Sequence, residues 1–497
     1  KNQIRESLEI VKEYIKKNEL ILVGGIAMDY ALKIKGSQIY DKYSIPDYDA
    51  ISPDFYTHAK NIAEILCKKD FPDVSAAPAI HNTTVRVKVS NYTVFDSTYC
   101  PKEVYKNIKT LKYLGLTIIH PNHQKIDQYN SLSFLFDQTG ISQNIYHRME
   151  KDIERNKLLI EYFPIISQKK PKEYQTIEIP TSLITSTNFK LFENNDTSYI
   201  ESNDTSYIKS NDTSYIESND NICCHGFLAY SIYYQSISDI YEKNKYFLDK
   251  IDGNKITKLF ENCIKSSFSI KNKNFIFEIP KNEYITLING NDNIQEINNN
   301  LKKIYKISKI ETYNKLLEVK PISQIYYTDK YNFEIFDISG RLLSCNLFKF
   351  EESDIIVSNY NYILSYFLMK YYFYNKDEYY LSYYLSLINI IEIANILSNN
   401  SKINQYNLVN FNYSISTYGK YNFNESFYYY IPNFNYLIKY HKNSSDKPGK
   451  LYPKYPECKV NKEFNEEESP FFSINGALNN KLKITNYIDI LKKKNIL

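Results

Sequence analysis

The chain of 497 residues is long enough for two to four domains, each with a core of its own. Its 61 Lys and Arg barely exceed its 57 Asp and Glu, so the charge permits a polyanionic partner without requiring one. No apolar run reaches the roughly 18 residues of a membrane span, and the first residues lack the pattern of a secretory signal, so we expect no membrane association. Seven scattered cysteines without a repeated CxxC pair are typical of reduced thiols in a cytosol-like compartment.

The most unusual feature of the composition is 50 tyrosines beside no tryptophan. Tyrosine rings can stack on nucleic-acid bases and so serve a nucleic-acid-binding surface. Tyrosine also shares A/T-rich codons with Asn, Ile and Lys, which are abundant here too. We favour the codon explanation for most of the tyrosines.

The start of the chain predicts a helix, a strand, a tight turn and a second helix. Apolar residues recur at helical spacing between residues 4 and 15, and the apolar run at 20–23 predicts a buried strand. Gly24 and Gly25 follow this strand directly. A second helix is expected after them, with Gly36 as its end.

A short strand predicted at 45–51 carries Asp47 and Asp49. Residues two apart in a strand point to the same face, about 6.5–7 Å apart, so these carboxylates project side by side. A later predicted strand at 92–98 carries Asp96, which joins them if the two strands are neighbours. Taken singly, each of these acids also has an ordinary interpretation as a loop or strand-end residue.

The remaining elements of the first half complete an α+β pattern with a small mixed sheet and flanking helices. Asp54 is the expected N-cap of a helix, and a turn is expected near Ser90. The other predicted elements are a strand at 84–89, a strand at 114–120, and helices at 127–137 and 143–163.

Residues 194–220 repeat an octapeptide of the form NDTSYIES. A period of eight is too short for a helical solenoid unit, and Ser, Asn and Asp favour turns. We interpret the segment as an exposed insertion, with a binding array as the alternative.

The second half echoes the first in three places and in the same order. Gly226 opens a predicted helix as Gly25 does, 332–339 resembles 91–98, and a later helix resembles the one near residue 131. An internal duplication explains the order, and chance similarity in a biased composition is the rival. The second copy has one glycine, and its predicted strand at 275–288 offers no Asp-x-Asp.

The combination of a strand, two glycines, a helix and converging acids predicts a nucleoside-triphosphate site. Crowded carboxylates repel one another unless cations neutralise them, and Mg²⁺ suits carboxylates and phosphates. Two such ions about 3.5–4 Å apart can support an in-line displacement at phosphorus. Gly24 and Gly25 let the backbone approach the phosphates at a helix N-terminus.

Gly-Gly followed by Asp47-Tyr-Asp49-Ala and a third Asp on a later strand resembles the polymerase-β-like nucleotidyltransferase superfamily. The segments IIHPNHQKIDQYNSLS (118–133) and YHRMEKDIERNKLLIEYF (146–163) resemble the viral poly(A) polymerase catalytic subunits of poxvirus and giant-virus type. The resemblance covers residues 1–165 well. One departure is that 21 residues separate Gly25 from Asp47, for which an inserted loop at about 36–43 accounts.

This resemblance implies a template-independent polynucleotide adenylyltransferase that adds AMP from ATP to RNA 3′ ends. It implies that Asp47, Asp49 and Asp96 bind two Mg²⁺ or Mn²⁺ ions and that Gly24 and Gly25 contact the triphosphate. It also implies a second, degenerate nucleotidyltransferase-like subdomain, a homodimer, and a cytoplasmic location in the host or its viral factory, or packaging in the virion. The alternatives are another acceptor, as in an oligoadenylate or cyclic-dinucleotide synthase, and a non-catalytic RNA-binding subunit.

We therefore expect a catalytic domain at 1–165, a connection with the repeat insertion at 166–220, and a second domain for RNA binding or dimerisation at 221–497. Further candidates for phosphate or adenine contacts are Lys125, Tyr129, Arg148, Lys151 and Arg155, and an ordinary charged helix face is the alternative for 146–157. Arg86 and Lys88 are expected to face RNA or water. The run Cys223-Cys224-His225 is interpreted as buried thiols rather than a zinc site, because its ligands are not paired a few residues apart.

Overall fold

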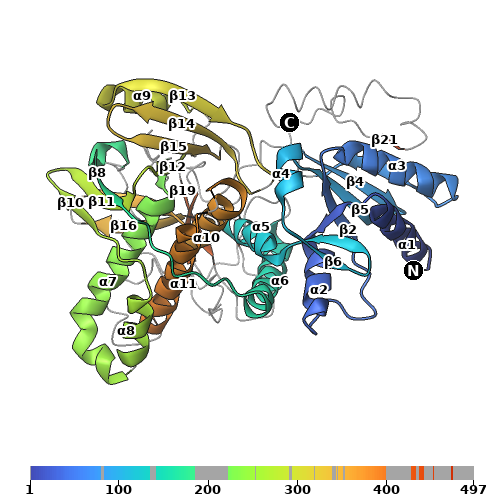
Figure 1. Cartoon of the computed structure of the whole chain (residues 1–497), viewed down its shortest axis with the longest axis horizontal. Coiled ribbons are helices and arrows are strands. Elements are labelled where there is room, and N and C mark those ends of the chain that lie inside the picture. Colours follow the sequence, from blue (N-terminus) through green and yellow to red (C-terminus); the bar gives the residue numbers. More distant parts are fainter. Residues whose placement is uncertain are drawn as a thin grey trace, which may run out of the picture.

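The computed structural model describes residues 2–79, 83–134, 141–184, 222–251, 253–289, 294–317, 319–338, 343, 345–350, 353–375 and 377–398, and short strands at 427–431, 436–440, 451–452 and 472–473. These residues form a mixed α+β fold, as predicted. Elements of the first half (blue) and of the second half (green to orange) lie on opposite sides of α5 (Pro121–Ser133) and α6 (Ile141–Tyr162) (Figure 1). The octapeptide repeat lies outside the described residues.

The first sheet is built around β1 (Ile21–Val23), which pairs antiparallel with β2 (Tyr48–Ser52) and parallel with β7 (Leu116–Ile119). On its other side β2 pairs in parallel with β5 (Tyr92–Tyr99). The described strands follow the order β21-β3-β4-β5-β2-β1-β7-β6, in which the further members are β3 (Ser75–Pro78), β4 (Thr84–Val89), β6 (Thr110–Tyr113) and β21 (Phe472–Ser473).

The helices of the first half follow the apolar periodicity of the sequence. The buried side chains of α1 (Asn2–Lys17) include Ile4, Leu8, Val11 and Ile15. The others are α2 (Gly24–Ile34), α3 (Phe55–Lys68) and α4 (Lys102–Asn107). Asp54 occupies the N-cap position of α3 as predicted, but its carboxylate makes no capping hydrogen bond; its N–H instead binds Ser52 Oγ at 3.0 Å.

A second sheet repeats the central strand order of the first. Here β9 (Ile222–Cys224) pairs antiparallel with β12 (Ile285–Asn289) and parallel with β17 (Ser353–Ser358), and β12 pairs in parallel with β15 (Asn332–Asp337). The described order β13-β14-β15-β12-β9-β17-β16 matches β3-β4-β5-β2-β1-β7-β6 in position. The same order and the same pairing directions confirm the degenerate second copy that the sequence echoes predict.

The second half contains further elements around this repeated core. Its helices are α7 (Gly226–Ile251), α8 (Gly253–Glu261), α9 (Gln295–Ile304), α10 (Tyr360–Met369), the π-helical turn η3 (Lys370–Asn375) and α11 (Tyr379–Ser398). The remaining strands of its sheet are β13 (Ile307–Tyr313), β14 (Ile322–Thr328), β16 (Cys345–Phe350), β18 (Phe427–Ile431), β19 (Tyr436–Tyr440) and β20 (Leu451–Tyr452).

The predicted strand at 275–288 is wrong as a single element. Its first part, β11 (Asn274–Pro280), lies in a separate sheet between β10 (Phe268–Lys271) and β8 (Tyr174–Pro180), which is followed by the 3₁₀ turn η1 (Thr181–Leu183). Its second part is β12. The strand is interrupted because Pro280 provides no N–H for a further ladder hydrogen bond and Asn282 takes a φ of 69°.

The helices α5 and α10 occupy equivalent places, after β7 and after β17, and they pack against each other. Ser365 Oγ donates to the carbonyl of Ile126 at 3.2 Å, and Ser133 Oγ to Asn359 Oδ1 at 3.2 Å. These contacts join the two halves of the molecule.

The helix predicted at 127–137 corresponds to α5. It begins earlier than predicted, at Pro121, because proline suits the first helical position, and it ends earlier, at Ser133.

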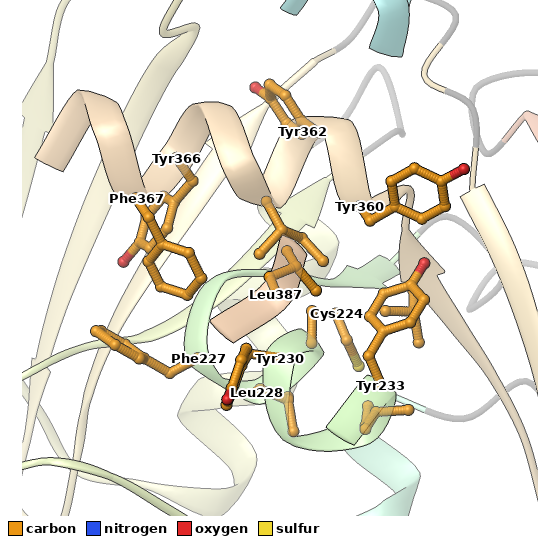
Figure 2. Packing of buried hydrophobic residues seen from close by; sticks show 14 of the residues in the cluster. Cys224, Phe227, Leu228, Tyr230, Tyr233, Tyr360, Tyr362, Tyr366, Phe367 and Leu387 are labelled. Carbon is orange, nitrogen blue, oxygen red and sulfur yellow. The ribbon is translucent and has the colours of Figure 1, made fainter. Parts of the chain in front are cut away.

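Tyrosines fill much of the core of the second half. Figure 2 shows Tyr230, Tyr366 and Phe367 converging beside Phe227 at the start of α7. Among the described residues, the largest fully buried side chains include Tyr129 of α5 and eight tyrosines of the second half: Tyr230, Tyr233, Tyr326, Tyr362, Tyr366, Tyr380, Tyr383 and Tyr384. These tyrosines build the core instead of offering surfaces for stacked bases. In the described part of the chain no helix is long and apolar enough to cross a membrane.

Candidate active site

The three acids predicted from the sequence lie together at one edge of the first sheet. Asp47 directly precedes β2, Asp49 lies within it, and the parallel register of β2 and β5 places Asp49 beside Asp96. One carboxylate oxygen from each residue lies within 4.8 Å of the other two. Within the described ranges, this is the one group of three or more His, Cys, Asp or Glu side chains that fits a metal ion.

The site carries more negative charge than its own side chains neutralise. Burial raises the pKa of Asp47, and the nearby Asp96 raises it further. Burial raises the pKa of Asp49 well above its ordinary value, and Asp47, Asp96 and Asp127 of α5 add to the effect. Burial and the neighbouring acids thus outweigh Arg86, and for Asp47 also Lys151, which both favour the ionised form by lowering the pKa. A set of hard oxygen ligands with unmet negative charge is what Mg²⁺ or Mn²⁺ requires.

Arg86 provides part of the missing positive charge. It lies opposite Asp96 in the antiparallel pair of β4 and β5, and its Nη2 and Nε atoms donate to the carboxylate at 2.6 and 2.9 Å. Arg86 is half-buried and stays in partial contact with water, as expected, but its guanidinium is bound to Asp96. The guanidinium fixes the orientation of Asp96. Lys88, two residues further along β4, is half-buried.

The glycine turn touches the carboxylates directly. Gly24 has a φ of +68°, a left-handed conformation that favours glycine, and a Cβ atom there would lie 2.3 Å from Asp49 Oδ2. The strand–turn–helix segment and the acidic strand therefore form a single site. The first N–H groups of α2, which have no partner within the helix, begin beside the acids.

A tyrosine that the sequence did not single out also lies at the turn. The Tyr40 hydroxyl accepts a hydrogen bond from Arg155 Nη2 at 2.8 Å. Burial raises the pKa of Tyr40; Arg155 opposes the shift, and the charges of Asp47 and Asp49 increase it. Tyr40 belongs to the loop that lengthens the spacing between Gly25 and Asp47, and this unusual length was the one signal in the sequence that pointed to it.

The other candidates from the sequence separate into two groups. Lys125 is buried and its Nζ donates to the carbonyl of Phe163, and burial lowers its pKa to about 7. Tyr129 is buried with its hydroxyl 2.7 Å from that of Tyr384. The predicted substrate contact of both residues is wrong, because α5 is enclosed between α6 and α10.

The remaining candidates lie on α6. Lys151 is exposed, and its charge lowers the pKa of Asp47, which places it near the acids. Arg155 reaches the glycine turn, as described above. Arg148 belongs to the same helix, but its side chain lies outside the described part of the structure.

The second copy keeps the glycine turn but not the acidic set. Gly226 has a φ of +58°, and a Cβ there would lie 3.1 Å from Thr286, so Thr286 stands where Asp49 stands in the first copy. Thr286 pairs with Glu334 in the parallel register of β12 and β15, so Glu334 corresponds to Asp96. The predicted match of 332–339 with 91–98, which aligned Asp337 with Asp96, is therefore wrong by three residues.

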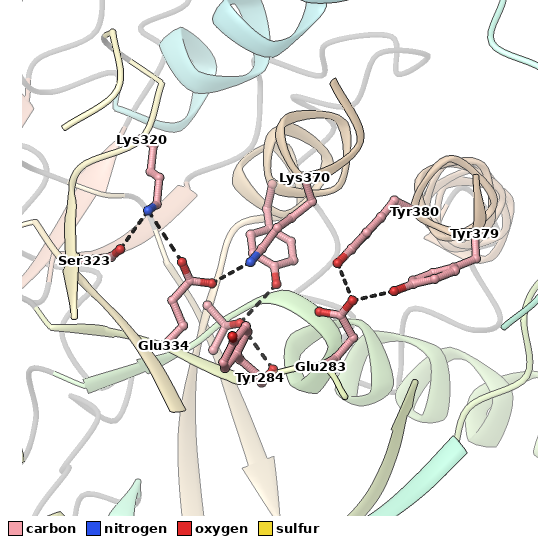
Figure 3. A network of polar contacts seen from close by, with 10 residues as sticks. Glu283, Tyr284, Lys320, Ser323, Glu334, Lys370, Tyr379 and Tyr380 are labelled. Atoms are coloured by element: carbon pink, nitrogen blue, oxygen red, sulfur yellow. Dashed lines mark hydrogen bonds and ion pairs between the residues drawn. The ribbon is translucent and has the colours of Figure 1, made fainter. Parts of the chain in front are cut away.

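Lysines of the protein surround the acid of the second copy. Figure 3 shows Glu334 between Lys370, whose Nζ lies 2.7 Å from Oε2, and Lys320, whose Nζ lies 3.6 Å from Oε1. Burial opposes ionisation of Glu334, but Lys370 and Lys320 outweigh it, so its pKa lies below the ordinary value. The ammonium groups of Lys370 and Lys320 thus neutralise the acid of the second copy.

The run at 223–225 is buried, as predicted, and lies at the end of β9. Cys223 and Cys224 are 0% and 1% exposed. His225 Nδ1 lies 2.8 Å from Ser358 Oγ, its ring stacks on Tyr362, and burial lowers its pKa to about 3. This arrangement is part of the core.

Comparisons with known proteins agree with this geometry. Residues 9–138 match the family model "Poly(A) polymerase catalytic subunit". A putative poly(A) polymerase catalytic subunit of African swine fever virus (isolate Tick/South Africa/Pretoriuskop Pr4/1996) is 38% identical over 192 residues, which is 38% of this chain and 40% of that protein. One from Acanthamoeba polyphaga mimivirus is 29% identical over 163 residues, 32% of this chain and 27% of that protein. The matches thus span less than half of these relatives.

A solved structure extends the similarity in fold over most of the chain. The crystal structure of the Megavirus polyadenylate synthase superposes with a TM-score of 0.52 at 20% identity, covering 80% of this chain and 70% of that one. This similarity confirms the predicted α+β fold over most of the chain, and the family model and the viral relatives confirm the resemblance to viral poly(A) polymerase catalytic subunits.

Proposed function

Because residues 9–138 match the family model "Poly(A) polymerase catalytic subunit", we propose that this chain transfers AMP from ATP to the 3′ hydroxyl of RNA without a template. The observation that carries the proposal is the convergence of Asp47, Asp49 and Asp96 within 4.8 Å, beside a glycine turn that opens a helix. The viral origin of the relatives supports an enzyme of mRNA polyadenylation that acts in the host cytoplasm or viral factory.

Each group has a distinct task in this reaction. The N–H groups at the start of α2 bind the triphosphate, with Gly24 allowing the close approach of Asp49. Asp47, Asp49 and Asp96 would hold Mg²⁺ or Mn²⁺, which, when bound, activates the attacking hydroxyl and stabilises the leaving pyrophosphate. Arg86 holds Asp96 in place and limits the repulsion among the acids. The RNA 3′ oxygen bonds to the α-phosphorus as the bond to the bridging oxygen breaks.

The second copy has a different task. Glu334 is already neutralised by Lys370 and Lys320, and Thr286 stands where an acid is needed. We expect this half to support the first through the packing of α5 on α10, and to contribute to binding of RNA or to a homodimer.

Primer extension tests the proposal. Wild-type protein with Mg²⁺ or Mn²⁺ is offered each of the four nucleotides, with and without an RNA primer. We expect extension of the primer with ATP. Product formed only without a primer would assign the chain to a synthase of short nucleotides, and no product under either condition would contradict nucleotidyl transfer.

A further inference from the structure

The loop between Gly25 and Asp47 is held firmly against α2. The carboxylate of Asp29, 1% exposed, accepts the N–H groups of Ile39 and Tyr40 at 2.8 and 3.0 Å. The same carboxylate pairs with Lys33 at 2.6 Å. A buried acid that binds two successive backbone N–H groups fixes the direction in which the next side chain, that of Tyr40, points.

Tyr40 and Arg155 meet on the surface of the glycine turn. A Cβ atom at Gly25 would lie 2.2 Å from Tyr40 Oη and 3.1 Å from Arg155 Nη2. Arg155 Nη2 donates to Tyr40 Oη at 2.8 Å, and its guanidinium carbon lies 5.7 Å from the Tyr40 ring centre. The pair thus covers the backbone where α2 begins, the place that the proposed function gives to a phosphate.

Arg155 is only partly satisfied in this arrangement. Its Nε atom is buried and has no hydrogen-bond partner among the described residues. A buried, charged donor without an acceptor is costly, so it points to a ligand that completes the pair. A guanidinium matches phosphate with two parallel hydrogen bonds.

We propose that Tyr40 is a latch on the triphosphate site: its hydroxyl holds Arg155 over Gly25 and is displaced by a phosphate oxygen when ATP binds. This inference rests on the proposed function and names the group that recognises the triphosphate. A phosphate oxygen replaces Tyr40 Oη as the acceptor for Nη2, and a second oxygen provides the acceptor that Nε lacks. The exchange changes hydrogen-bond partners only, and Tyr40 acts as a positioning residue.

Steady-state kinetics of primer extension separate a latch from a merely structural contact. Arg155→Gln should raise the KM for ATP about 10- to 100-fold, with a smaller change in kcat, since a charge-assisted hydrogen bond to the bound substrate is lost. Arg155→Lys should recover part of this loss. Tyr40→Phe should lower the KM for ATP two- to fivefold at unchanged kcat, because it removes the hydroxyl that competes with a phosphate oxygen for Arg155 Nη2.

Matched controls exist on the same elements. Tyr43, in the same loop, and Lys157, on the same helix, are exposed, and Tyr43→Phe and Lys157→Gln should leave both constants unchanged. A KM for ATP within twofold of wild type in Arg155→Gln, or a raised KM in Tyr40→Phe, would contradict the latch. Because the wild type would still extend RNA, the proposed function would not be affected.

Displacement of the latch can be observed without turnover. The chain contains no tryptophan, so Tyr40→Trp places a single reporter at the turn. ATP with Mg²⁺, and tripolyphosphate with Mg²⁺, should shift its emission towards that of an exposed indole, whereas adenosine should not. Tyr43→Trp provides the unresponsive control. The same shift with adenosine, or no shift at ATP concentrations that saturate extension, would refute triphosphate recognition. A normal shift in a protein that extends no RNA would instead refute the proposed acceptor.

Discussion

The two copies of the core differ chiefly in how their acids meet positive charge. In the first, three acids converge, and Arg86 pairs with Asp96. In the second, one acid remains at an equivalent place, and Lys370 and Lys320 lie against it. The sheets are otherwise repeated in order and direction.

This difference shows how a fold can lose an acidic cluster without losing its core. A buried carboxylate must be paired or it destabilises the folded state. The second copy meets this requirement with its own side chains, which leaves no unmet charge for a divalent ion. In the first copy the three acids are only partly compensated, which is why we propose that cations and a nucleotide bind there.

The largest expected effect removes the acids of the first copy. Asp47→Ala with Asp49→Ala should reduce primer extension by about 10³-fold or more, because the hydroxyl and the leaving group lose their metal support. In the second copy Tyr284 precedes Thr286 by two residues, as Asp47 precedes Asp49, so the matched change is Tyr284→Phe with Thr286→Val. This variant should leave extension within about threefold of wild type. Equal losses in both double variants, with both proteins folded by circular dichroism, would contradict the division of tasks.

The next effect is on stability and concerns the second copy. Glu334→Gln leaves Lys370 and Lys320 buried without their acid, and removal of one partner from a buried ion pair typically costs about 3–5 kcal/mol. Urea denaturation should show this loss in the free energy of unfolding. If Glu334→Gln is as stable as wild type, the lysines do not depend on Glu334 and the comparison of the two copies fails.

A smaller effect of opposite sign is expected in the first copy. Asp49→Asn should increase the free energy of unfolding in metal-free buffer by roughly 0.5–1 kcal/mol near neutral pH, because it removes a repelling charge. The pKa of Asp49 is raised in the folded state, so wild type loses stability as the pH rises from the ordinary value near 3.9 through the raised one. The advantage of Asp49→Asn should therefore grow with pH in urea titrations, and disappear when Mg²⁺ and ATP are added. If the stability advantage of Asp49→Asn over wild type shrinks as the pH rises, the pKa of Asp49 is not raised in the folded state.

The convergence of the three acids could be predicted because it follows from local rules. Strand periodicity places Asp47 and Asp49 on one face, and the order of the strands brings Asp96 beside them. Tyr40 could not be predicted in this way, since its loop has no periodicity and its position depends on hydrogen bonds to Asp29.

The errors arose where tertiary contacts override the local pattern. Lys125 and Tyr129 have the residue types of a substrate-binding face, but the packing of α5 on α10 buries them. The similar letters around Asp337 suggested an alignment with Asp96, whereas the pairing of Thr286 with Glu334 fixes a register three residues away. Side-chain identity alone does not reveal register, because register is set by the neighbouring strand.

Binding of Mn²⁺ in the presence of ATP, followed by electron paramagnetic resonance of the free ion, tests the central claim most directly. The account predicts that wild type and the Tyr284→Phe/Thr286→Val variant bind Mn²⁺ equally. It also predicts that Asp47→Ala with Asp49→Ala abolishes the binding. Undiminished Mn²⁺ binding in the latter variant, or its loss in the former, would contradict the assignment of the cation site to the first copy.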